Sequence, residues 1–222
     1  MKVIFAFILL ASSFSVFAQN EQSPMVEKTF DYKDWTYKNI RTDGSTNLRE
    51  LTKGKKLVMV VYFAPWCPNW KHDAPLVQAL YDKYRSSGLE VIAVGEYDPV
   101  AAMKTNLEEL KITFPAVYES DLRTTRETTT HATQRRETDD TRKWGSPWYI
   151  FLEPSMMEQN GDVLTKKASI VNGEIIRDEA EKYIRTKLGL PAEASKAGLS
   201  GSTKIEVCEP EKKAASLKKP QN

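Results

Sequence analysis

Three apolar runs without polar alternation predict strands that are buried on both faces. The runs are "KLVMVVYFA" (56–64), "LEVIAVGE" (89–96) and "SPWYIFLEP" (146–154). Strands of this kind are typical of the centre of a sheet that helices cover on both sides. After the first run, apolar residues recur at spacings of three and four over residues 68–87, which predicts a helix that ends at Gly88.

Shorter signals complete the predicted order of elements. Residues 98–111 and 178–189 have helical patterns. An Asp-Gly pair at 43–44 and Asn-Gly pairs at 160–161 and 172–173 indicate hairpin turns. The order strand, helix, strand, helix, strand, strand, helix predicts an α/β fold, with a mixed central β-sheet flanked by helices.

The two ends of the chain and one internal segment depart from this pattern. Residues 1–18 combine Lys2, an apolar stretch and small residues before Gln19, which predicts a cleaved signal peptide and no stable membrane insertion afterwards. Residues 19–35 are expected to form a loosely ordered lead-in, residues 36–190 one domain, and residues 191–222 a disordered tail. Residues 121–143, rich in Thr, Arg, Asp and Glu, predict a polar, partly helical insertion on the surface.

Charge and cysteine content restrict the possible functions. The 222 residues carry a net charge of only +2, so we expect no nucleic-acid partner. Export would place the mature chain in the periplasm or outside the cell, where thiols meet oxidants. The two cysteines are Cys67 and Cys208.

Cys67 lies where a predicted buried strand meets a predicted helix. Unpaired backbone N–H groups and the positive end of the helix dipole favour a thiolate at such a position. Lys71, one turn further, adds positive charge. A buried structural cysteine in the helix cap remains the alternative, because cysteine is often buried.

The stretch "VVYFAPWCPNWKHDAPLVQALYDKY" resembles the active-site strand and helix of thioredoxin-fold proteins, especially the exported TlpA/ResA-like branch. Members of that branch read roughly "FWAxWCxPCxxExP" here. "LEVIAVGEYD", "LKITFPAVYES" and "WGSPWYIFLEP" resemble later segments of the family in the same order, so that the similarity spans about residues 40–188. This resemblance implies a thioredoxin-like fold and a thiol–disulfide oxidoreductase-type function.

The resemblance also assigns roles to individual residues. Cys67 matches the attacking cysteine, and Pro147 matches the proline that is cis in the family and lies against the active sulfur. Ser146, just before it, matches the residue whose backbone can bind an extended substrate. The residues expected to support the site are Trp66, Pro68, Trp70, Lys71, Ser146 and Pro147.

Two departures from the family pattern change the predicted chemistry. Trp70 occupies the position of the resolving cysteine, and Val61 lies where thioredoxins often carry a buried carboxylate. We therefore predict monothiol exchange at Cys67, with disulfides of exported proteins or small thiols as substrates. Cys208 is either a remote resolving residue or a free or intermolecular cysteine of the tail.

The alternative function is a non-catalytic protein that binds peptides or partners and has lost dithiol turnover. In that case Trp70 would cover the sulfur or present a hydrophobic platform. An efficient peroxidase is not expected, because Ala64 stands where peroxiredoxins carry a Thr or Ser. We expect His72 and His131 to be solvent-exposed, and we expect neither metal nor cofactor.

Overall fold

Strand β5 (Leu57–Phe63) runs through the middle of the sheet with every side chain buried. The structure is a computed structural model that describes residues 22–191. In its eight-stranded sheet the order is β2-β9-β8-β5-β6-β7-β3-β4. Strands β5, β6 and β7 are parallel, and β8 pairs with β5 in the antiparallel direction. The predicted α/β fold with a mixed central sheet is confirmed.

The seven elements of the predicted order appear in that order as β5, α2, β6, α3, β8, β9 and α5. Strands β1 to β4 and helix α1 precede them, β7 and α4 lie between α3 and β8, and β10 lies between β9 and α5. The strands are β1 (Gln22–Ser23), β2 (Val26–Lys33), β3 (Thr36–Asn39), β4 (Ser45–Asn47), β5, β6 (Leu89–Gly95), β7 (Ala116–Tyr118), β8 (Trp148–Leu152), β9 (Val163–Val171) and β10 (Glu174–Ile175). The helices are α1 (Leu48–Thr52), α2 (Pro68–Tyr84), α3 (Val100–Glu109), α4 (Thr130–Glu137) and α5 (Arg177–Leu188). Short 3₁₀ turns lie at Arg85–Ser87, Arg123–Thr128 and Pro154–Met156.

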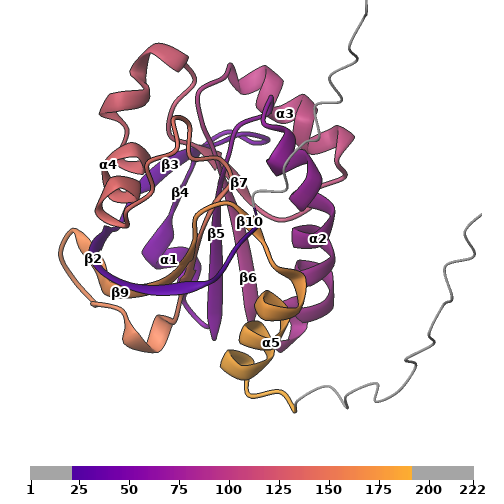
Figure 1. Cartoon of the computed structure of the whole chain (residues 1–222), viewed down its shortest axis with the longest axis vertical. Helices are drawn as coiled ribbons and strands as arrows, with labels where there is room; N and C mark the ends of the chain where they lie inside the picture. The colour runs from indigo at the N-terminus through magenta and orange to yellow at the C-terminus, as the bar shows by residue number, and fades with distance from the viewer. Residues whose placement is uncertain (1–21, 192–222) are drawn as a thin grey trace, which may run out of the picture. The chain divides into compact units, whose positions relative to one another are not determined.

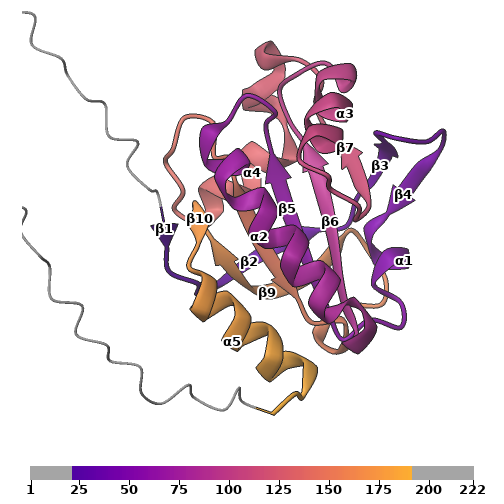
Figure 2. The ribbon, with the colours of Figure 1, turned by 90° about the vertical axis from the view of Figure 1, so that its right-hand side faces the viewer.

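Alternate residues of β5 enter two separate cores, one on each face of the sheet. Met59, Val61 and Phe63 pack with residues of α2, α3 and α5, whereas Val58 and Val60 pack with Leu48 of α1 and with residues of β2 and β9. Helices α2 and α5 lie side by side on the first face, whereas α4 lies towards β2 and β9 (Figures 1 and 2). Because both faces are covered, the central strands lack polar alternation.

The expectation of a loosely ordered lead-in at residues 19–35 is wrong for the residues that the structure describes. Strand β2 pairs antiparallel with β9, from Val26 opposite Ile170 to Lys33 opposite Val163. Only Phe30 and Tyr32 of this strand are buried. An edge strand with few buried positions gives a weak hydrophobic signal, which explains the error.

The insertion at residues 121–143 is partly helical, as predicted, but it is not confined to the surface. Helix α4 begins after Thr129, whose side chain accepts a hydrogen bond from the Ala132 N–H. Four residues of this helix are buried: His131, Ala132, Gln134 and Arg135. The predicted signal peptide and all of the predicted tail beyond Pro191 lie outside the described residues. Within residues 22–191, no helix is both long and apolar enough to cross a membrane.

Candidate functional site

Cys67 is the residue that caps the N-terminus of helix α2. Its backbone is extended (φ −75°, ψ 120°), and Pro68 occupies the first turn, where a missing N–H removes no helical hydrogen bond. The thiol is free and only 6% of the residue is exposed. The sulfur therefore belongs to the residue at the positive end of the helix dipole and is largely shielded from water, although it accepts no capping hydrogen bond from a first-turn N–H. Cys208 lies outside the described residues, so its pairing with Cys67 stays a prediction.

The loop before β8 brings Ser146 and Pro147 against this sulfur. The Ser146–Pro147 peptide bond is cis, as the resemblance implied. Cys67 Sγ donates to the Ser146 carbonyl oxygen at 3.2 Å, and the Ser146 hydroxyl oxygen accepts from the Ala64 N–H at 2.9 Å. The loop is thus bonded both to the sulfur and to the residue that follows β5.

Trp70 is a core residue, so the idea of an exposed hydrophobic platform is wrong. Its side chain is fully buried, and its ring packs against Phe63 with centroids 5.0 Å apart. The indole Nε1–H donates to Asn106 Oδ1 of α3 at 2.9 Å. The position of the resolving cysteine is therefore filled by a ring that joins α2 to the sheet and to α3.

Two arginines of the insertion, and Trp144 directly after it, form a cluster with Trp66, the residue before Cys67. Trp144 contacts Trp66 edge-on, with ring centroids 5.1 Å apart. The Arg123 guanidinium lies 5.1 Å from the Trp66 ring centroid, and that of Arg126 lies 4.7 Å from the centroid of Trp144. Such cation–π contacts hold Trp66 between the active-site turn and the insertion.

An open groove of about 440 Å³ is lined in part by Trp66. Lys71 and Glu109 give it both signs of charge, and Asp98 in its wall pairs with Arg123 at 3.3 Å. Lys71 is exposed, and its backbone N–H donates to the Cys67 carbonyl oxygen at 3.2 Å. Lys71 thus places a positive charge on the surface of the protein, one helical turn from Cys67.

A buried carboxyl group, Asp73, is the residue of the site that the sequence analysis missed. Its Oδ2 accepts from the Tyr149 hydroxyl at 2.7 Å and from the Ile175 N–H at 2.8 Å. Burial in the first place, with Glu174 adding to it, raises the pKa of Asp73 to about 6. Cys67 and Tyr149 belong to the same buried core, and the charge of Cys67 contributes to the raised pKa of Tyr149 after burial and Asp73.

The signal for Asp73 was present in the family motif. The acidic residue of "WCxPCxxExP" falls on position 73 in this chain. Val61 is buried, as expected of its strand. The absence of a carboxylate at position 61 stands, and Asp73 is a different buried carboxyl, in the second turn of α2.

The two histidines differ in exposure. His72 is exposed, as predicted, whereas His131 is fully buried, which corrects the expectation of a surface residue. The His131 ring stacks on Tyr62 with centroids 4.6 Å apart, and its Nδ1 lies 2.8 Å from the Tyr97 hydroxyl. Burial lowers the pKa of His131 well below its ordinary range, so the ring is neutral at physiological pH.

A second buried acid follows strand β6. The Glu96 side chain is fully buried, and burial, reinforced by neighbouring Glu119, raises its pKa well above the ordinary range. The Glu96 N–H donates to the Phe63 carbonyl oxygen at the end of β5. Burial therefore disfavours the charged form of this carboxyl.

Comparison with characterised proteins identifies similar sequences. The chain is 27% identical over 130 residues to the thiol-disulfide oxidoreductase ResA of Oceanobacillus iheyensis, covering 58% of this chain and 56% of that protein. It is 31% identical over 78 residues to ResA of Halalkalibacterium halodurans, covering 35% of this chain and 43% of that protein. The matched regions thus span about half of these relatives.

Solved structures with the same fold have lower sequence identity. A secreted thiol-disulfide isomerase from Corynebacterium glutamicum superimposes with a TM-score of 0.55 and 11% identity, covering 73% of this chain and 92% of that one. A thioredoxin-family thiol:disulfide interchange protein from Chlorobium tepidum gives a TM-score of 0.52 and 15% identity, with 73% and 98% covered. These similarities show the thioredoxin-like fold.

The family assignment rests on the match to a family sequence profile. The sequence profile of the AhpC/TSA family covers residues 30–140, half of the chain, from strand β2 through helix α4. This segment includes Cys67 and Asp73. The chain therefore belongs to the AhpC/TSA family, as a thioredoxin-fold protein of the ResA-like type.

Proposed function

We propose that this protein is a monothiol thiol–disulfide oxidoreductase in which Cys67 is the nucleophile. The observation that carries the proposal is the position of Cys67: it caps α2, and its sulfur lies 3.2 Å from the Ser146 carbonyl oxygen beside the cis Pro147. The family assignment and the ResA relatives support the reaction type. Disulfides of exported proteins or small thiols are the proposed substrates.

The first step is attack of the Cys67 thiolate on a substrate disulfide. A bond forms between Sγ and one substrate sulfur, the substrate S–S bond breaks, and the second substrate sulfur leaves as a thiolate that takes up a proton. Trp70 cannot attack the resulting mixed disulfide. An external thiolate therefore displaces Cys67 from the substrate sulfur, which restores the starting thiolate.

Other residues of the site are proposed to bind the substrate and to transfer the proton. The backbone of Ser146, whose carbonyl accepts from Cys67 Sγ in this structure, is the proposed hydrogen-bonding partner of an extended substrate. Asp73, with a pKa of about 6, exchanges a proton near neutral pH and is the proposed acid–base group. Trp66, next to Cys67 in the chain, packs edge-on against Trp144.

The pattern of residues 1–18 supports an exported location. An oxidising compartment would supply disulfide substrates, and a small external thiol would take the role that a resolving cysteine has elsewhere.

Two single-cysteine variants test the proposal. Cys208→Ser leaves only Cys67, and Cys67→Ser leaves only Cys208. Each variant is incubated with an aromatic disulfide reagent and then with a small thiol, and the mixed disulfide is followed by intact mass. We expect Cys208→Ser to form one mixed disulfide at neutral pH faster than free cysteine does, and the thiol to reverse it. Equal rates for Cys208→Ser and free cysteine would contradict the proposal.

The limited exposure of Cys67 favours one alternative, a binding protein that retains the substrate loop without turnover. Peptide binding to the wild-type chain and to Cys67→Ser separates the two functions. A binding protein would hold a cysteine-free peptide equally well in both forms and would not form the mixed disulfide. Retained exchange in Cys208→Ser excludes this alternative.

A further inference from the structure

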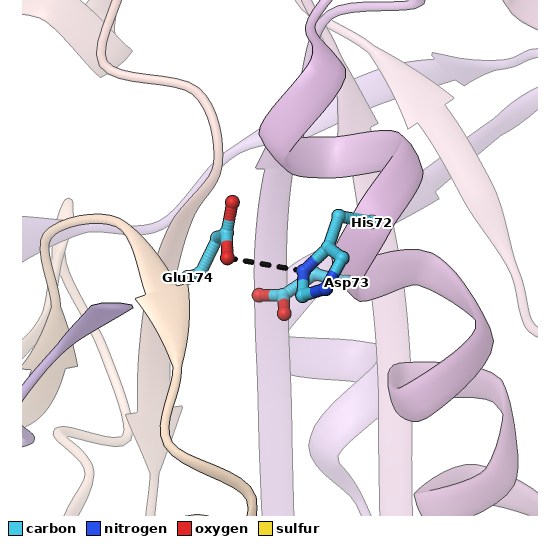
Figure 3. Close-up of side chains that lie close together, drawn as sticks. All are labelled: His72, Asp73 and Glu174. Atoms are coloured by element: carbon cyan, nitrogen blue, oxygen red, sulfur yellow. Dashed lines mark ion pairs between the residues drawn. The ribbon is translucent and has the colours of Figure 1, made fainter. Parts of the chain in front are cut away.

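Three potential metal ligands converge at the side of α2 that faces β10. His72 and Asp73 come from the second turn of the helix, and Glu174 comes from the strand that follows the 172–173 turn. One ligand atom from each residue lies within 4.8 Å of the others. Figure 3 shows the His72 ring directed at the Glu174 carboxylate, with the Asp73 carboxylate beside them. His72 Nδ1 lies 3.0 Å from Glu174 Oε2.

The two carboxylates of this cluster are buried. Asp73 and Glu174 are each only 2% exposed, and they lie next to one another. Adjacent buried negative charges are unfavourable unless a cation or proton neutralises them. The raised pKa of Asp73, caused by burial and then by Glu174, agrees with this.

Asp73 is held in an orientation that leaves one oxygen available. Both hydrogen bonds that the structure gives to its carboxylate, from the Tyr149 hydroxyl and the Ile175 N–H, go to Oδ2. Within residues 22–191, Oδ1 accepts no hydrogen bond. Bonds of this kind from outside a cluster fix the direction of a metal-ligating carboxylate.

We propose that His72, Asp73 and Glu174 bind a divalent first-row transition metal ion, with Zn²⁺ as the best match. One imidazole nitrogen and two carboxylate oxygens form a ligand set that suits zinc, which also accepts a water as the fourth ligand. Bonds of about 2.0–2.2 Å in a tetrahedral site place ligand atoms about 3.5 Å apart. The cluster reaches that spacing through small side-chain rotations of His72 and Glu174.

His72, the exposed member of the three ligands, gives the ion a route to the site. The His72 side chain is 57% exposed, whereas the two carboxylates lie beneath it. An ion therefore reaches the imidazole first and leaves one coordination position towards solvent for water. Occupancy would keep Asp73 ionised and unable to take up a proton, but metal binding itself does not depend on the proposed thiol exchange.

Metal titration of the full chain tests the site. After removal of metals with a chelator, the protein is titrated with Zn²⁺ by calorimetry and in competition with a chromophoric chelator. We expect one saturable site that His72→Ala and Glu174→Gln each weaken by at least about 100-fold, since even second-shell losses reach about 10–100-fold. His72→Ala changes an exposed side chain, so this variant is expected to fold normally. Asp82→Asn, an exposed acid on the same helix, is the matched control and should bind as the wild type does.

Cobalt substitution distinguishes this site from a thiolate site. Co²⁺ bound by His72, Asp73 and Glu174 gives visible d–d bands without the near-ultraviolet charge-transfer band of a cobalt thiolate, and Cys67→Ser leaves the spectrum unchanged. Three results would overturn the proposal: the absence of saturable binding, wild-type affinity in His72→Ala, or loss of the site in Cys67→Ser.

Discussion

The buried carboxyl of Asp73 makes the stability of this protein depend on pH in a direction opposite to that of most aspartates. Its pKa rises from the ordinary value of 3.8 to about 6, mainly through burial. The folded chain thus holds this proton more tightly than the unfolded chain does. Each pKa unit corresponds to about 1.4 kcal/mol, so that roughly two units give up to about 3 kcal/mol.

Asp73→Asn isolates this contribution because an amide does not titrate. The amide oxygen can still accept from the Tyr149 hydroxyl and the Ile175 N–H, which preserves the local geometry. In the wild type, the stabilisation that the protonated carboxyl provides is complete below about pH 4 and is lost as pH rises through about 6. The free energy of unfolding of the variant, relative to the wild type, should therefore rise by up to about 3 kcal/mol between about pH 4 and pH 8.

Urea unfolding of both proteins at several pH values measures this difference. The buffer contains a chelator, because a cation bound at Asp73 would keep its carboxyl ionised. His72→Gln is the control for titration of the neighbouring ring, and it should leave most of the pH dependence in place. A difference between Asp73→Asn and wild type that stays constant across this pH range would refute the argument from burial.

Two further substitutions test the packing around the site, each by urea unfolding. Trp70→Phe keeps a ring against Phe63 but leaves the buried Asn106 Oδ1 without its indole donor. We expect this loss to destabilise the fold by about 1–3 kcal/mol. An unchanged unfolding midpoint would show that the hydrogen bond contributes nothing to stability. Gly145→Ala places a Cβ at φ +58° and 2.0 Å from Arg135 Nε, so we expect a loss of roughly 2–4 kcal/mol. Gly161→Ala, at φ +86° with nothing within 4 Å, measures backbone strain alone, and an equal loss in both alanine variants would exclude the steric effect.

Much of the fold could be predicted because its central strands are buried on both faces. The uninterrupted apolar run around β5 and the Asn-Gly turns around β9 correspond to the observed strands. Edge strand β2 was missed because most of its residues are exposed, and its pairing with β9 depends on contacts distant in sequence.

A residue of the candidate site could be predicted only where its neighbours in the sequence already reveal its structural environment. Cys67 is evident from the strand-to-helix junction. Asp73 looks like a solvated acid of an amphipathic helix, and its burial becomes visible only when Tyr149 and Ile175 are brought to it. His131 was misjudged for the same reason, since its polar sequence neighbours do not reveal the ring of Tyr62 on which it stacks.

The packing of Trp70 limits how this chain could acquire a dithiol site. Tryptophan and cysteine codons differ by one nucleotide, so a CxxC motif is a single mutation away. That mutation would remove about 100 Å³ of side chain from a closed core, at about 24 cal/mol per Å³, and so cost roughly 2–3 kcal/mol. It would also leave Asn106 without its indole partner. A second cysteine at position 70 is therefore one nucleotide change away but costly in the folded protein, where compensating changes in α3 would have to come first.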